Sequence, residues 1–173
     1  AGGTFQLSYT TNGLLTDVQG PKGASYTYTM SYNSTGQIVS ASDPAGGSTT
    51  LRRNGITNGY EVISTSALGR ASTARVEFMP AGDLRRTLVL SDGTTQEQWK
   101  VSNGMETNRY PNGTTVRWTE RPDPRFGMQA PIQSNLIVRL PSGLAMTATV
   151  SRAVTLTNQN WASVASLTNT ATV

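Results

Sequence analysis

Short segments of alternating apolar and polar residues run along the chain, separated by turn-forming residues. In the first segment Phe5, Leu7 and Tyr9 alternate with polar residues, and the same alternation returns at residues 28–32. A period of two is typical of a strand that buries one face and exposes the other to water. The pattern therefore predicts β-strands with one apolar side.

These segments repeat at a fixed interval. Tyr9 and Tyr32 lie 23 residues apart, and Phe78 follows Tyr32 after 46 residues, twice that interval. Self-similarity at this period indicates stacked supersecondary units, none of which buries its own apolar face alone. The signature positions are Tyr9, Gly13, Leu15, Pro21 and Gly23 in the first unit, Tyr32, Gly36, Ile38, Pro44 and Gly46 in the second, and Phe78, Gly82 and Leu84 further on.

Each unit is interpreted as a β-hairpin. Asn12-Gly13 predicts a type I′ turn, because both residue types tolerate positive φ. The predicted fold class is all-β, with antiparallel β-hairpin repeats stacked into a twisted strip or open, solenoid-like sheet over residues 1–173. The units are expected to be clearest at 5–23 and 28–46 and degenerate at 51–69, where Gly59 and Gly69 follow Gly36 and Gly46 at the same interval, and at 76–93, with 144–173 as a cap or a set of edge strands.

The signature resembles a known family. The signature consists of a Tyr, three residues, Gly, one residue and Leu or Ile, followed by a closing Asp-Pro-x-Gly, as in Tyr32–Ile38 and Asp43–Gly46. This pattern is similar to the YD repeat of bacterial Rhs and related proteins. The Asp that names the repeat is replaced here by Thr10 and Asn33. The segment 123–131 also looks like a stretch found in large bacterial proteins of this kind.

The resemblance implies a fold and a set of roles. Such repeats form spiralling β-strips that in large toxins close into a shell around a variable C-terminal effector. It implies an extracellular or cell-surface bacterial protein with a structural, non-enzymatic role. On this resemblance the chain is expected to be a fragment of a larger protein or a small relative that uses the strip differently.

The chain contains neither cysteine nor histidine. Catalytic triads, Cys-His pairs and imidazole or thiolate metal sites are therefore unavailable, and we expect no cofactor, no metal site and no catalytic residues. The carboxylates Asp83, Asp92, Glu97 and Glu106 are expected on turns and wet strand faces rather than in a paired catalytic site. An enzyme is accordingly the least favoured class of function.

Charge raises a second class of function. The net charge is +4 and the isoelectric point about 9.8, which favours anionic partners. If alternate strands align Arg53, Arg75, Arg85 and Arg117, a basic stripe with Trp99 or Trp118 beside it forms a candidate surface for polyanionic polysaccharide or, less favoured, nucleic-acid single strands. The alternatives are solubilising charge for the arginines and core packing for the tryptophans.

A stack of repeats also predicts where the aromatic residues and the unpaired edge strands lie. Tyr9, Tyr28, Tyr32 and Phe78 are expected to form an internal stack along the sheet. Unpaired edge strands invite pairing with other repeats or a second copy, and residues 147–173 are either a cap or a donor to a neighbouring sheet. An extracellular carbohydrate- or cell-surface-binding module and a filament-forming subunit therefore remain alternatives to the scaffold. No apolar run approaches the length of a membrane helix.

Overall fold

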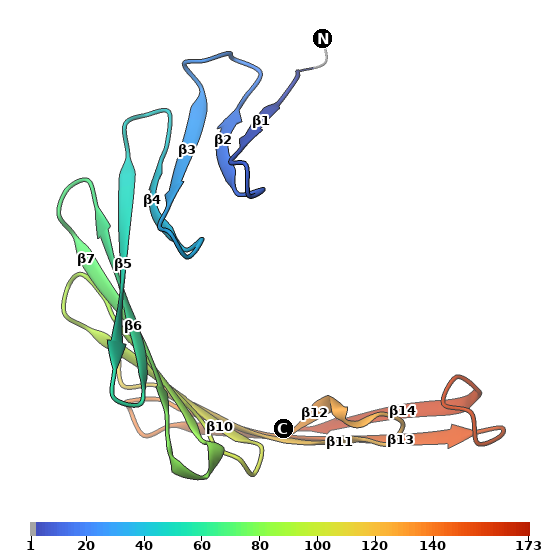
Figure 1. The fold of residues 1–173 in the computed structure, drawn as a ribbon. Coiled ribbons are helices and arrows are strands. Elements are labelled where there is room, and N and C mark those ends of the chain that lie inside the picture. The colour runs from blue at the N-terminus through green and yellow to red at the C-terminus, as the bar shows by residue number, and fades with distance from the viewer. Residues whose placement is uncertain (1–2) are drawn as a thin grey trace. The chain divides into compact units, whose positions relative to one another are not determined.

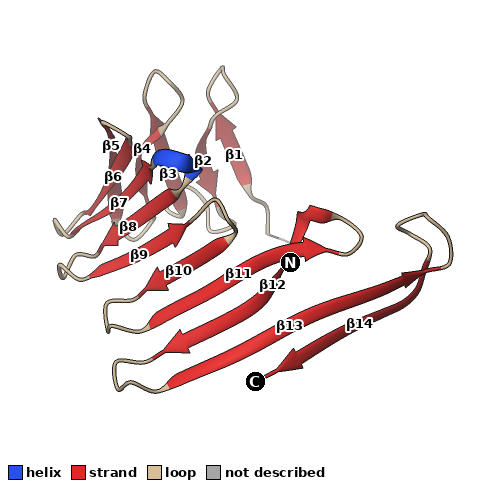
Figure 2. Cartoon of the chain, turned by 90° about the horizontal axis from the view of Figure 1, so that it is seen from below, coloured by secondary structure: helices blue, strands red, loops and turns tan. Residues whose placement is uncertain are grey.

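The structure of the chain is a computed structural model that describes residues 3–173. Strands follow one another in chain order, and each is hydrogen-bonded to the next in a 14-stranded sheet with β1 and β14 at the ends of the order (Figures 1 and 2). The predicted all-β sheet of consecutive antiparallel hairpins is confirmed. The described residues hold no helix with the length and hydrophobicity needed to cross a membrane.

The shortest strand is the first, β1, and the longest, β12 and β13, lie near the end of the chain. Their bounds are β1 Gln6–Tyr9, β2 Leu15–Gln19, β3 Thr27–Tyr32, β4 Ile38–Ser42, β5 Ser48–Ile56, β6 Gly59–Ser66, β7 Ala71–Phe78, β8 Leu84–Val89, β9 Thr95–Lys100, β10 Met105–Arg109, β11 Thr115–Asp123, β12 Gly127–Arg139, β13 Ala145–Leu156 and β14 Val164–Thr172, with a short 3-10 turn, η1, at Pro80–Gly82. Residues 147–173, predicted as cap or donor, form most of β13 and the whole of β14, which pair with each other.

Internal contacts divide the chain into two compact units. The first comprises residues 3–75 with Val89–Gly93, and the second Val76–Leu88 with Thr94–Val173. Each unit is described by itself below.

One turn geometry accounts for the repeat. After β3, the amide of Asn33 donates to the carbonyl of Gln37 at 2.9 Å, and the amide of Gly36 donates to the carbonyl of Asn33 at 3.0 Å. Gly36 has a φ of 79°, a conformation in which a Cβ atom is strained. The same pair of hydrogen bonds closes the turns that begin at Thr10, Asp43, Ser66, Val101, Tyr110 and Leu140.

The predicted type I′ turn is wrong. Among the described residues Ala81 is the only non-glycine residue with positive φ, so Asn12 does not adopt the conformation that type I′ requires. The register shifts between Ser8 and Tyr9 and between Ser31 and Tyr32, beside the turns that end each hairpin. A type I turn followed by a left-handed glycine and a bulge fits these observations. Asn-Gly is compatible with both turns, and the sequence does not distinguish them.

The first residue of the turn is Thr, Asn or Asp in different hairpins, and one contact explains this exchange. Asn33 Oδ1 accepts the amides of Thr35 at 3.0 Å and Gln37 at 2.9 Å, and Asp43 Oδ1 accepts those of Ala45 and Gly47 in the same way. Thr10 Oγ1 accepts the amide of Leu14 at 3.0 Å. At these three turns a short side chain with an acceptor oxygen, supplied by Asp, Asn or Thr, adds to the backbone bonds, whereas the turns that begin at Val101 and Leu140 form without one.

The third hairpin has a different tip. Ile56 pairs with Gly59, so β5 and β6 are joined through Thr57 and Asn58 alone. Gly59 lies in β6 and does not have positive φ, whereas Gly69 does. The predicted unit at 51–69 therefore shares its closing turn with the repeat but not its central one.

The sheet is a single layer without a core. None of the described hydrophobic residues is buried. Among the described charged residues, Glu106 and Asp123 are buried. The aromatic stack expected of Tyr9, Tyr28, Tyr32 and Phe78 is wrong, because the ring pairs in the described chain are Tyr26 with Tyr28 and Phe126 with Trp161. Tyr32 instead donates its hydroxyl to the carbonyl of Leu15 at 2.7 Å, which ties neighbouring hairpins together.

We predict that Gly36→Val destabilises the chain by about 1 to 3 kcal/mol, because a β-branched residue is strained at positive φ. The matched control is Gly55→Val, since Gly55 lies in β5 and a Cβ atom there meets nothing within 4 Å. Urea denaturation followed by circular dichroism measures both. Equal stability of the two variants would contradict this account of the turn.

Candidate functional site

The acidic residues of the described chain are dispersed or paired with basic groups, and none of them forms a metal cluster. Residues 3–173 contain no group of three or more metal-ligating side chains. Several of the carboxylates are held by arginine: Glu61 lies 2.9 Å from Arg75, and Glu97 lies 2.5 Å from Arg85. Asp83 accepts the amide of Ser102 at 2.8 Å. The two faces of the sheet are therefore the surfaces on which a function is to be sought.

The first unit has an apolar face and a polar face. Residues that pair across strands share a face, as do residues two apart along a strand. The register places Leu7 opposite Val18, Val18 opposite Tyr28, and Met30 opposite Ala41. The apolar face of the first unit continues over β5 and β6 with Leu51, Arg53, Tyr60 and Val62.

Hydroxyl groups cover the opposite face of the first unit. Thr29 and Ser42 share a hydrogen bond across β3 and β4, and Ser31 and Ser40 share another at 2.5 Å. Further along this polar face Glu61 accepts hydrogen bonds from Asn54 at 3.1 Å and Arg75 at 2.9 Å. These bonds lower the pKa of Glu61, with the Arg75 contact the largest cause.

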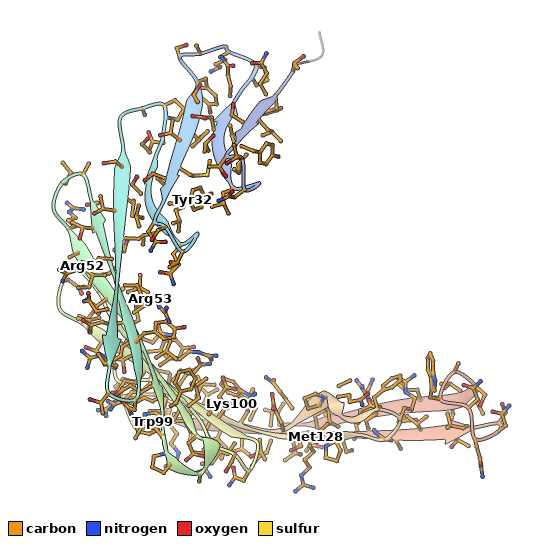
Figure 3. All side chains as sticks on the ribbon, viewed as in Figure 1. Tyr32, Arg52, Arg53, Trp99, Lys100 and Met128 are labelled. Atoms are coloured by element: carbon orange, nitrogen blue, oxygen red, sulfur yellow. The ribbon has the colours of Figure 1, made fainter. Side chains whose placement is uncertain are left out.

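A groove opens on the apolar face where β4 and β5 separate. The two strands pair over Ser40–Ser42 and Ser48–Thr50. Beyond this point a hollow of about 440 Å³ is lined by apolar side chains of both strands and of β6, with amide and guanidinium groups at its rim. The guanidinium of Arg53, a residue labelled in Figure 3, lies over the ring of Tyr60 at 4.2 Å from its centroid.

The second unit shows the same division. Trp118 lies opposite Leu136, and Leu136 opposite Ala148, while Val116, Val138 and Met146 form a parallel row on the same face. This apolar face of the second unit borders a charged cluster on β9–β11. There the half-exposed Lys100 lies 3.8 Å from Glu106 and 3.3 Å from Glu120.

Glu106 is the buried acid of this cluster. It is 8% exposed and accepts a hydrogen bond from Gln98. Its position directly across from Trp118 and Lys100 explains the burial. The sequence placed Glu106 among scattered surface carboxylates, and that prediction is wrong because the strand alternation turns it towards the tryptophan.

The polar face of the second unit carries Trp99. Trp99 lies opposite Thr107, Thr107 opposite Arg117, and Arg117 opposite Ile137. The guanidinium of Arg85 lies 4.9 Å from the centre of the Trp99 ring. Arg85 is also held by Glu97 at 2.5 Å and by Glu77 at 3.8 Å. Trp99 is therefore covered by a paired arginine.

The predicted ligand surface is brought together only in part. Arg85, Trp99 and Arg117 share the polar face of the second unit, whereas Trp118, the neighbour of Arg117 along β11, lies on the opposite face. In the first unit the predicted stripe is interrupted as well. Arg53 pairs across from Val62 on the apolar face, while Arg75 binds Glu61 on the polar face.

A buried aspartate fastens two hairpins in the second unit. β12 and β13 pair from Arg139 to Asn135, after which the hairpins β11–β12 and β13–β14 separate. Asp123, 3% exposed, bridges them by accepting a hydrogen bond from Arg152 at 2.7 Å. The rings of Phe126 and Trp161 meet beside it with centroids 5.6 Å apart. A polar hollow of about 500 Å³, rimmed by hydroxyl groups, lies between the hairpins.

Asp123 also closes its own turn. Its Oδ1 accepts the amides of Arg125 at 2.7 Å and Phe126 at 3.3 Å. The bond from Arg152 is the largest cause that lowers the pKa of Asp123, followed by the bond from the Arg125 amide. The sequence of segment 123–131 predicted no role for it. The structure shows that this segment begins with Asp123, the residue that holds the two hairpins together.

No protein-family model matches the chain, and no curated protein matches its sequence.

We predict that Asp123→Asn lowers the thermal midpoint of unfolding by a few degrees at neutral pH, because Arg152 loses its charged acceptor. The folded pKa of Asp123 is lowered below the unfolded value of about 3.9, so its contribution to stability is present above about pH 4. That contribution is lost as the pH falls through the folded pKa.

The measurement is the unfolding midpoint between pH 7 and pH 2. The variant should lose less stability on acidification than the parent chain. Asp17→Asn is the control, since Asp17 accepts only from Thr16 in the described structure and holds no arginine. If Asp123→Asn and the parent chain respond alike to acid, Asp123 does not carry this stability.

Proposed function

We propose that the chain is a non-enzymatic scaffold: a β-strip of the YD-repeat kind that forms part of the wall of a larger extracellular bacterial assembly. The observation that carries this proposal is the uncovered apolar face. In each unit, rows of aliphatic and aromatic side chains share one side of a single layer, and no hydrophobic residue in the described chain is buried.

The exposed area supports the same conclusion. The chain exposes 11517 Å², whereas a close-packed monomer of 18.4 kDa exposes roughly 8,200 Å². The excess of about 3,300 Å² is several times the 800 Å² or so that one partner contributes to a standard protein interface. A sheet with this much uncovered surface is suited to packing against further protein layers.

The polar face complements this role. Its serine and threonine hydroxyls bond to one another across strands, as Ser31 and Ser40 do, so this side is satisfied without a covering layer. A wall needs one face for protein and one for water, and both units provide them. In the family that the repeat resembles, such walls surround a toxin effector, and we extend that role to this chain.

We predict that the isolated chain binds the apolar dye ANS and self-associates with increasing concentration, because its apolar face lacks a cover. The double variant Leu51→Thr/Val62→Thr, which makes that face polar in the first unit, should reduce dye fluorescence and association several-fold. Far-UV circular dichroism checks that the strands persist, and sedimentation velocity measures association.

The matched control is Ile56→Thr/Ile63→Thr on the same two strands. Asn54 pairs with Glu61 and Arg52 with Ile63, so Ile56 and Ile63 belong to the polar face. This control should leave dye binding and association unchanged. A chain that stays monomeric and binds no dye at any concentration would overturn the proposal. If Leu51→Thr/Val62→Thr associates as strongly as the parent chain, the association occurs through the open strand edges and not through the apolar face.

A further inference from the structure

We propose that Arg109, Arg117 and Arg139 form a binding site for an acidic polysaccharide on the polar face of the second unit. We call these residues the arginine triad. The proposal does not rest on the scaffold function, because it concerns the opposite face of the sheet. It also differs from the stripe predicted by the sequence, with which it shares only Arg117.

The register brings the triad together. Arg109 of β10 lies opposite Thr115 of β11, and Thr115 lies opposite Arg139 of β12, so all three share a face. Arg117 stands two residues beyond Thr115 on the same face. With strands about 4.8 Å apart and a rise of about 3.4 Å per residue, Arg109 and Arg139 are separated by about 10 Å and Arg117 lies about 8 Å from each.

No carboxylate in the described chain neutralises the triad. All three arginines are exposed, and none forms an ion pair, in contrast to Arg75, Arg85 and Arg152. Glu97 lies directly across from Arg109, but it is bound to Arg85 at 2.5 Å. Like charges held close together without partners destabilise one another, and an anionic ligand relieves that repulsion.

The surroundings favour a sugar chain over a nucleic acid. Guanidinium groups bind carboxylates and sulfates in bidentate fashion, and hydroxyl groups such as those of Thr107 and Thr115 lie between the arginines in the register. Single-stranded nucleic acid requires open aromatic rings on which bases stack. Trp99, on the neighbouring strand of this face, is covered by Arg85, which leaves Tyr110 at one end of the triad rather than a row of open rings along it.

Room for a sugar ring lies at one end of the triad. A hollow of about 400 Å³ beside Arg109 is lined by Thr95, Glu97 and Tyr110. An acidic polysaccharide with one ring in this hollow extends its further carboxylate or sulfate groups over Arg117 and Arg139. The ligand class is therefore a linear polymer with repeated negative charges rather than a single acidic sugar.

The test is binding to heparin, a sulfated polysaccharide that contains uronate, measured by titration calorimetry at several salt concentrations. The triple variant Arg109→Ser/Arg117→Ser/Arg139→Ser should lower the affinity by at least about tenfold in low salt. It should also flatten the dependence of affinity on salt, since fewer counterions are released on binding. Neutral dextran should not bind the parent chain.

A second triple variant controls for net charge. Arg52→Ser/Arg70→Ser/Arg86→Ser removes the same number of exposed positive charges elsewhere on the chain and should weaken binding much less. The variant with lysine at the three triad positions keeps the charge, and it should recover the salt dependence but only part of the affinity, because lysine does not bind in bidentate fashion.

Three outcomes would overturn the proposal. Equal losses in the two serine variants would show a diffuse effect of net charge. Equal or tighter binding of single-stranded DNA of matched charge would assign the triad to nucleic acid. Absence of heparin binding by the parent chain, with its strand content intact by circular dichroism, would remove the site altogether.

Discussion

The fold depends on a five-residue turn in which backbone and side chain satisfy each other. Two backbone hydrogen bonds close it and a glycine takes the left-handed conformation, and in the early hairpins a side-chain oxygen at the first position accepts the amides that remain, as Asn33 does. Because the turn is complete in itself, it specifies where each hairpin ends without help from a second layer. The strand register then follows from the bulge beside it, which determines which side chains share a face.

A single layer changes what holds the strands together. In a two-layer domain, burial of apolar side chains provides most of the driving force. Here the same side chains are only partly covered, so contacts within each face contribute a larger share of the stability. Arg53 lies over the ring of Tyr60, and Arg85 lies over the ring of Trp99 and binds Glu97. Pairs of hydroxyl groups are hydrogen-bonded between β3 and β4. Such contacts are individually weak, which makes the uncovered apolar face the dominant unsatisfied feature of the molecule.

Much of the fold was predictable because its signals are local. Alternation, turn glycines and the repeat interval predicted hairpins near the start of the chain, and the strand pairs β1–β2 and β3–β4 are found there. The turn type was not predictable, since Asn12-Gly13 fits two geometries. The surface was predictable only in part, because the face of a residue depends on bulges and register. Trp118 and Arg117 are neighbours in sequence and lie on opposite faces, while the triad joins three strands whose pairing no local pattern reveals.

The separation of hairpins shows how a repetitive sheet acquires distinct sites. Where β4 leaves β5, and where β12 leaves β13, the backbone ladder ends and side chains define hollows of different character, apolar in the first unit and polar in the second. The second opening is bridged by Asp123 and Arg152, residues far apart in sequence. A buried charge pair is a costly way to join two strands unless position matters more than stability. Its presence indicates that the separation of these hairpins is a fixed feature of the fold.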